Sequence, residues 1–347
     1  MRDHVDHDPI RTVADLHLTV GEPMVQMAEG MFGLRLPLPF VLNHVNLWLL
    51  RDGDGWTLID TCIDNEPTRS FWSETLESGL DGRPLRRIIA THFHPDHMGL
   101  AGWLCEQTGA ALWTTRTEWL LGRGLANDVS AAFVDAGRLY DQRAGLDAEH
   151  VLARAERGNL YRTRAGTPAG TYTRVTDGDD LVIDGELWRV IIGPGHAPEM
   201  ICLYSAERGI LISADHVLQK ISPNISVTPS EPDADPLNDY MTSFDPFRAL
   251  PEDTLVLPSH GQPFHGLHAR IDELIAHHHV RLERTAEAAG KGRTAVDIMP
   301  ALFERELDAH QLGFALGEAL AHLNYLVFKG DLKRELDSAG AYRYSAA

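Results

Sequence analysis

The stretch 92–97, His-Phe-His-Pro-Asp-His, constrains this chain more than any other part of its sequence. It brings three imidazoles and one carboxylate together directly after the apolar run 85–90. Neutral imidazole and carboxylate are ligands that zinc, iron and manganese accept, and catalytic metal sites leave a coordination position open. A polar surface loop would explain any one of these side chains, but it does not explain the whole set at the end of a strand.

The spacing within this stretch indicates two adjacent metal ions rather than one. Alternate residues of an extended segment point to the same side, so His92 and His94 can reach one ion together. Asp96 and His97 follow where the chain turns into a helix, which aims them at a neighbouring point.

The later chain supplies the ligands that six residues alone cannot provide. An apolar run bounded by Gly or Pro and ending in a polar residue is typical of a buried strand that delivers a side chain to one edge of a sheet. Three such runs occur, and they lead to His196 (run 187–192), Asp215 (run 209–214) and His260 (run 254–259).

The set His-x-His-x-Asp-His, Gly-His, Ala-Asp and Ser-His-Gly, in this order, resembles the metallo-β-lactamase superfamily of hydrolases over residues 25–268. The resemblance implies an α/β fold, the αββα sandwich, around two divalent ions, with zinc expected first and iron or manganese as alternatives. It implies one metal on His92, His94 and His196. A second metal is implied on Asp96, His97 and His260, with Asp215 bridging both. True β-lactamases usually lack an Asp matching Asp96 or carry Cys where Asp215 stands, so the resemblance does not imply that activity.

Two residues near the predicted site depart from a plain ligand role. In this family an Asp like Asp60 ends a buried strand beneath the metals, and we interpret Asp60 as support for a ligand rather than a ligand. The family commonly has Gly where Cys62 stands. We expect Cys62 to be a buried, inert thiol, the alternative being a thiol close to the site.

Residues 116–172 differ from the rest of the catalytic region because they are helical in composition and supply no ligand in the family pattern. We interpret them as a helical insertion overhanging the metals. Five Arg and a single acid occur between residues 154 and 174. Guanidinium groups hold phosphate or carboxylate by paired hydrogen bonds, so Arg162 and Arg164 are candidate substrate-binding residues. The alternative is a solvated helix face.

From residue 267 to 347 the pattern predicts three helices and a short β-ribbon, which resembles the winged-helix module of some superfamily members. We therefore expect three parts: a flexible N-terminal arm (1–20), a catalytic domain (21–266) and this C-terminal domain (267–347). Its helices carry many acids, and nucleic-acid binding depends on cationic side chains. Homodimerisation or closure over the active site is the favoured role of this part.

Composition limits the partners. The chain has 31 Lys and Arg against 50 Asp and Glu, a net charge of −19, which works against attraction to nucleic acid or anionic membranes. The three cysteines form no paired pattern, and no apolar run approaches the roughly 20 residues of a membrane span. The start of the sequence has no apolar core of a signal peptide. We expect a cytoplasmic protein.

Together these features predict a dinuclear metal-dependent hydrolase in which a metal-bridging hydroxide attacks an electrophilic centre and Asp96 orients the nucleophile. The expected substrate is a small-molecule thioester or ester, including a coenzyme A conjugate, or a lactone. Two alternatives stay open at this point. One is a phosphodiesterase or ribonuclease of the same superfamily, and the other is a nucleic-acid-binding regulator with a vestigial metal site.

Overall fold

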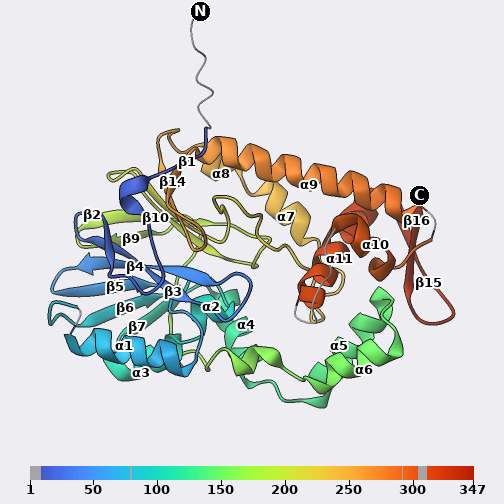
Figure 1. Ribbon diagram of the computed structural model, residues 1–347, viewed down its shortest axis with the longest axis horizontal. Helices are drawn as coiled ribbons and strands as arrows, with labels where there is room; N and C mark the ends of the chain where they lie inside the picture. Colours follow the sequence, from blue (N-terminus) through green and yellow to red (C-terminus); the bar gives the residue numbers. More distant parts are fainter. Residues whose placement is uncertain (1–8, 79, 291, 304–310) are drawn as a thin grey trace, which may run out of the picture.

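The computed structural model describes residues 9–78, 80–290, 292–303 and 311–347. Two seven-stranded sheets pack face to face, and helices cover the outer face of each (Figure 1). This is the αββα sandwich that the sequence predicts.

The first sheet contains the strands that precede the 92–97 stretch. Its strands, in spatial order, are β2 (Val25–Ala28), β3 (Met31–Pro37), β4 (His44–Asp52), β5 (Gly55–Ile59), β6 (Leu85–Ile89), β7 (Ala111–Thr114) and β8 (Thr173–Arg174). From β2 to β5 neighbours are antiparallel, and from β5 to β8 they are parallel. The helices α1 (Glu66–Ser78) and α3 (Ala101–Thr108) pack on its outer face. β4 and β5 form an antiparallel hairpin.

The second sheet contains the strands that lead to the three later candidate ligands. In spatial order these are β1 (Arg11–Thr12), β14 (Phe264–His265), β13 (Leu255–Pro258), β12 (Ile210–Ala214), β11 (Ile201–Ser205), β10 (Glu186–Ile192) and β9 (Asp180–Ile183). Within it, β12 and β13 run parallel. The helices α7 (Pro236–Thr242), α8 (Asp245–Arg248) and α9 (Leu267–Ala289) lie outside it (Figure 1).

The core between the sheets explains why several strands lack polar–apolar alternation. Trp48 and Ile59 of the first sheet meet Trp188, Leu203 and Leu257 of the second, each at most 1% exposed. Every residue of β5 and β12 is buried, since these strands are covered on both faces. Continuous apolar runs are what such strands require.

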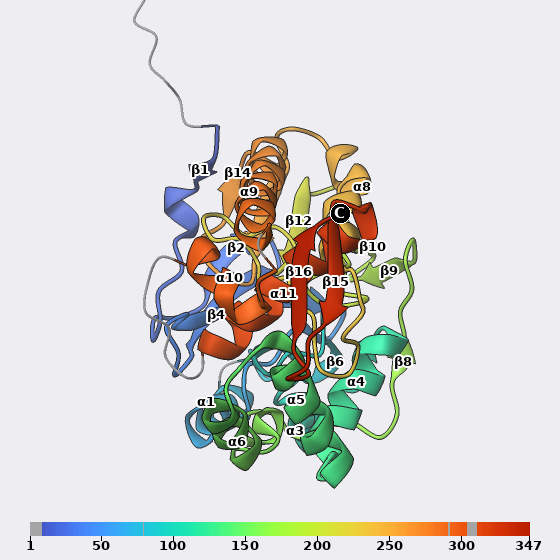
Figure 2. The same cartoon turned by 90° about the vertical axis from the view of Figure 1, so that its right-hand side faces the viewer.

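The segment 116–163 forms four short helical elements beside the sandwich. They are α4 (Arg116–Asn127), α5 (Ala131–Ala144), α6 (Ala148–Glu156) and the 3₁₀ helix η2 (Leu160–Thr163). Helices α5 and α6 lie along the C-terminal helices, on the side away from the second sheet (Figure 2). Side chains join the two regions, because Gln142 donates to the Ala339 carbonyl and Arg143 to the Gly340 carbonyl.

The C-terminal part follows the predicted order of three helices and a ribbon. After α9 come α10 (Ala295–Leu302), α11 (Gln311–Lys329), β15 (Leu332–Leu336) and β16 (Tyr342–Ala346). The sequence pattern predicts the second of these helices over residues 295–307, and residues 304–307 lie outside the described residues. One apolar cluster runs from the second sheet through α9 and α10 to α11, so this part shares its core with the catalytic region. The winged-helix comparison and the division into domains stay predictions.

Part of the expected N-terminal arm packs against the catalytic region in the structure. Arg11 and Thr12 pair with His265 and Phe264 of β14, and Leu18 is 1% exposed. The pairing partner lies some 250 residues later in the chain, so polar composition alone gave no sign of it. Residues 1–8, with His4 and His7, lie outside the described residues. Among the described helices, none is long and apolar enough to cross a membrane.

Two helical glycines provide a test of this packing. A Cβ on Gly102 in α3 would lie 2.0 Å from the Thr167 carbonyl oxygen, whereas a Cβ on Gly137 in α5 would meet no atom within 4 Å. Alanine is favoured over glycine in helices by roughly 1 kcal/mol, so Gly137→Ala should raise the free energy of unfolding by about that amount. Gly102→Ala should lower it by about 1–3 kcal/mol through overpacking. Denaturant titration of both variants measures these changes, and equal stabilities would contradict the packing of α3 against residues 167–168.

Candidate metal centre

The 92–97 stretch is placed by the end of a buried strand and the start of a short helix. β6 ends at Ile89, and α2 (Pro95–Met98) begins with proline at its first position. Proline fixes a backbone angle suited to a helix start and restricts the residue before it to extended geometry. His92 and His94 therefore lie in the bend between β6 and α2, and Asp96 and His97 lie in the first helical turn.

The three later residues reach the same edge of the sandwich. Asp215 follows β12 and His260 follows β13, and these strands are parallel with Ala214 opposite Pro258. Their carboxyl ends therefore lie together. His196 lies in the turn after β10, where Gly195 adopts a φ of +111° that favours glycine. Two backbone hydrogen bonds join the sheets here, from Ile201 N to the Thr91 oxygen (2.9 Å) and from Asn46 N to the Ser259 oxygen (2.7 Å).

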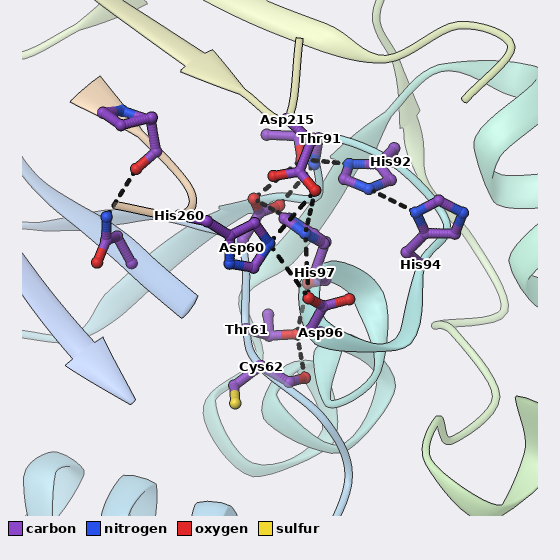
Figure 3. Close-up of polar contacts among 12 residues, drawn as sticks. Asp60, Thr61, Cys62, Thr91, His92, His94, Asp96, His97, Asp215 and His260 are labelled. Atoms are coloured by element: carbon purple, nitrogen blue, oxygen red, sulfur yellow. Dashed lines mark hydrogen bonds and ion pairs between the residues drawn. The ribbon is translucent and has the colours of Figure 1, made fainter. Parts of the chain in front are cut away.

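All seven predicted metal ligands converge in the structure. Figure 3 labels six of them, all except His196. They form three overlapping groups, with ligand atoms within 4.8 Å of one another: His92, His94 and His196; His92, His97 and Asp215; and Asp96, His97 and His260. Asp215 Oδ2 lies 3.3 Å from His196 Nε2, 3.3 Å from His260 Nε2 and 3.6 Å from His97 Nε2. This carboxylate therefore lies between the first and the last group.

Hydrogen bonds turn the free nitrogens of the imidazoles toward this centre. Nδ1 of His97 donates to Asp60 (2.8 Å), Nδ1 of His196 to the Asn224 carbonyl (2.8 Å) and Nδ1 of His260 to the His44 carbonyl (2.7 Å). With the proton held on Nδ1, the lone pair of Nε2 faces the other ligands. A second partner that fixes the tautomer in this way is typical of histidines that bind metal.

The cluster combines neutral imidazoles with carboxylates, a set of charges that suits a divalent cation. Burial, and then the neighbouring imidazoles, lower the pKa of His92 and His94 well below 6.5, so both are neutral ligands. Burial alone would lower the pKa of His97, but the carboxylates of Asp96, Asp215 and Asp60 raise it well above 6.5. Asp215 Oδ1 and His97 Nε2 are buried without a hydrogen-bond partner among the described residues. A divalent cation held between them would give both atoms a partner.

Asp60 supports the ligands from below, as expected. Its carboxylate accepts hydrogen bonds from Thr91 N (2.8 Å), Thr91 Oγ1 (2.9 Å) and His97 Nδ1. Asp60, Cys62 and Ala214 have positive φ values of 62°, 72° and 46°, an unfavourable conformation for residues other than glycine that gathers at functional sites. Burial raises the pKa of the Cys62 thiol to about 12, in agreement with the expected inert cysteine.

Sequence reasoning missed Glu118, a fully buried carboxylate on α4. It accepts hydrogen bonds from Phe93 N (2.9 Å), between two candidate ligands, and from Glu199 N (2.7 Å), three residues after His196. It thereby joins two ligand-bearing loops. Tyr161 of η2 adds a bond from its hydroxyl to the Phe93 carbonyl. The signal in the sequence was an acid at a helical position where an apolar residue is usual. It was overlooked because residues 116–172 supply no metal ligand in the family pattern.

The two predicted substrate-binding arginines occupy different environments. Arg162 Nε donates to the Ala126 carbonyl at the end of α4 (3.0 Å), so it holds the insertion together. The Arg164 guanidinium lies 4.6 Å from the centre of the Phe40 ring, and Asp96 opposes the lowering of its pKa by burial. Of the two, Arg164 is the one whose charge interacts with a candidate ligand.

Comparison with known proteins agrees with this geometry. Residues 41–260 match the family described as "Metallo-beta-lactamase superfamily". The chain belongs to this superfamily. Residues 282–347 match a second family, "Metallo-beta-lactamase-like, C-terminal domain", and this description does not decide whether the part is a winged helix. The chain is thus a metal-dependent hydrolase with a candidate divalent-metal site.

Individual relatives extend over most of the chain. The crystal structure of a beta-lactamase domain protein from Burkholderia ambifaria is 42% identical, with a TM-score of 0.86 over 93% of this chain and 94% of that one. The probable metallo-hydrolase YqjP of Bacillus subtilis is 26% identical over 86% of this chain and 92% of its own length. A linear primary-alkylsulfatase from Pseudomonas is 25% identical over 64% of this chain, but the match spans only 42% of that protein.

Glu118 predicts a pH dependence of stability. Burial raises the pKa of its carboxyl from 4.5 to about 7, so the protonated form stabilises the fold and this contribution is lost as the pH rises through 7. At about 1.4 kcal/mol per pKa unit, the metal-free protein should lose about 2–3 kcal/mol between pH 5 and 8 relative to Glu118→Gln, which does not titrate. Denaturant unfolding at both pH values measures this difference, and parallel pH profiles would contradict it.

Proposed function

We propose that the chain is a hydrolase with two divalent metal ions, zinc first, and that it acts on a small-molecule ester, thioester or lactone. The observation that carries the proposal is the position of Asp215. Its Oδ2 atom lies 3.3 Å from one imidazole of each ligand set, His196 and His260. A carboxylate shared by two sets of ligands suits a dinuclear site, in which the ions lie about 3.5–4 Å apart.

In this proposal the residues of the chain divide the chemistry among them. Bound ions would supply Lewis acidity and a water of lowered pKa. Asp96 would orient that water, because its carboxylate lies 3.5 Å from His260 Nε2 and is, at 20% exposure, more accessible than the Asp215 side chain at 8%. Asp60 and Glu118 would keep the ligand loops in place while substrate binds and leaves.

The substrate class is inferred from the border of the site. The Arg164 guanidinium lies over the Phe40 ring and interacts electrostatically with Asp96. Such a pair suits an anionic group attached to an organic body, as in a coenzyme A thioester. The similarity to a linear primary-alkylsulfatase supports a sulfate ester as a second candidate, whose anionic group would be the reacting one.

Metal removal and a ligand variant test the proposed site. The protein as purified should contain about two zinc, iron or manganese ions per chain by elemental analysis, as expected of a dinuclear site. Exhaustive chelation should abolish turnover, and adding metal back should restore it. Asp215→Ala should lose turnover to near background while its circular dichroism stays that of the wild type. Full activity after chelation would contradict the proposal.

A substrate panel ranks the candidate activities. It contains a coenzyme A thioester, a simple thioester, a lactone, an alkyl sulfate and a bis-aryl phosphodiester. The highest kcat/KM should be for the thioesters. Preference for the phosphodiester, with salt-dependent binding of oligonucleotides, would instead favour the nuclease alternative, which the net charge of −19 does not support.

Arg164 and Arg162 should differ in their effects. Arg164→Ala should raise KM for the coenzyme A thioester by about 10- to 100-fold, the loss expected for a hydrogen bond between charged groups, and leave a neutral thioester unaffected. Arg162→Ala should instead lower thermal stability, because it removes the bond to the Ala126 carbonyl. Steady-state kinetics on both substrates separate the two, and equal KM changes for charged and neutral thioesters would exclude anion binding by Arg164.

A further inference from the structure

The helices after residue 267 supply none of the seven candidate ligands, yet they hold the loop that contacts one of them. This loop, residues 216–235, runs from Asp215 at the end of β12 to α7. Its Asn224 carbonyl accepts the Nδ1 hydrogen bond of His196 at 2.8 Å. The orientation of His196 therefore depends on where this loop lies.

A chain of polar contacts connects Asn224 to the C-terminal helices. Asn224 Nδ2 donates to Glu318 Oε2 on α11 at 3.1 Å, and Glu318 Oε1 lies 2.8 Å from Arg281 Nη2 on α9. The Glu318 and Arg281 side chains are only 10% and 12% exposed. Hydrogen bonds to a charged group in a region of low dielectric are stronger than those at a surface, and losing one partner leaves the other buried and unsatisfied.

The C-terminal helices hold the backbone of the same loop at two further points. Val227 N donates to the Gly317 carbonyl (3.1 Å), and a Cβ on Gly317 would lie 2.8 Å from Ser226 Cβ, so α11 approaches the loop as closely as a glycine allows. Nearer β12, Arg270 of α9 donates to the carbonyls of Leu218 (2.7 Å) and Ile221 (3.0 Å). The segment that carries the Asn224 carbonyl is thus held on both sides of it.

We propose that Glu318, acting through the side chain of Asn224, is a positioning residue for His196 and that the C-terminal helices are in this way part of the metal site. This inference rests on the proposed dinuclear centre. Fixing the carbonyl keeps the proton of His196 on Nδ1 and its Nε2 lone pair on the metal side. Loss of such a supporting contact typically weakens metal binding by about 10- to 100-fold.

Reversing the direction of the Asn224–Glu318 hydrogen bond tests this role. Asn224→Asp keeps the shape of the side chain but removes the donor and sets two carboxylates against each other. Glu318→Gln in the same chain restores a donor, so N224D/E318Q can form the bond in the opposite direction while the Gln oxygen still faces Arg281. Zinc affinity is measured on metal-free full-length protein by competition with a chromogenic chelator, and cobalt(II) absorption reports the ligand geometry.

The expected result is a roughly tenfold or greater loss of affinity for one of two ions in N224D, with recovery in the double variant. The affinity for the other ion should not change. Glu283→Gln, which neutralises an exposed carboxylate on α9, is the matched control and should bind both ions as the wild type does. If N224D does not fold, Asn224→Ala gives the same comparison without adding a carboxylate.

Three results would overturn the inference, and they are distinguishable. Unchanged zinc affinity in N224D would show that His196 does not need the tether. Equal weakening in N224D and the double variant, with lowered thermal stability of both metal-free proteins, would show a general structural role only. Failure of the wild-type chain to bind zinc, cobalt, iron or manganese would overturn the proposed centre itself, and this inference with it.

Discussion

The buried carboxylate of Asp215 is the constraint on which the rest of the structure depends. A carboxylate removed from water is costly unless cations or hydrogen-bond donors surround it. Here the imidazoles of His97, His196 and His260 lie around Oδ2, and His260 and His97 lower the pKa of Asp215 well below its usual value, although burial opposes this. Its Oδ1 atom keeps no hydrogen-bond partner among the described residues. The buried carboxylate therefore forms a place for cations in the folded chain before any cation binds.

The two sheets make this arrangement possible because each contributes a parallel strand pair that ends at one edge. Ile59 lies opposite Ile89 in the first sheet, and Ala214 lies opposite Pro258 in the second. The residues that follow these strand ends include both carboxylates beneath and between the imidazoles, Asp60 and Asp215. Hydrogen bonds between the sheets at this edge, such as Asn46 N to the Ser259 oxygen, keep the two halves in register. The site therefore belongs to the sandwich as a whole rather than to one loop.

Features carried by neighbouring residues could be predicted from the sequence, whereas contacts between distant residues could not. The spacing of His92, His94 and His97 lies within six residues, and the apolar runs before His196 and His260 mark their strands directly. The fold class followed from the resemblance to the metallo-β-lactamase superfamily that these residues carry. By contrast, Glu118 acts on backbone N–H groups of Phe93 and Glu199, and no side-chain pattern records a contact with a backbone. The pairing of Arg11 with His265 could not be predicted for a related reason, since a strand of two residues is too short to show a periodicity.

The helical insertion and the C-terminal helices, which lie outside the sandwich, both contact loops that carry candidate metal ligands. The insertion reaches it through Glu118 and Tyr161, which bind the backbone on both sides of Phe93. The C-terminal helices reach it through the 216–235 loop, and the contact from Asn224 to Glu318 spans 94 residues. The insertion acts on Phe93 and on Glu199 after His196, and the C-terminal helices act on His196 through Asn224. Changes in either region would therefore alter the geometry of the centre without replacing any ligand.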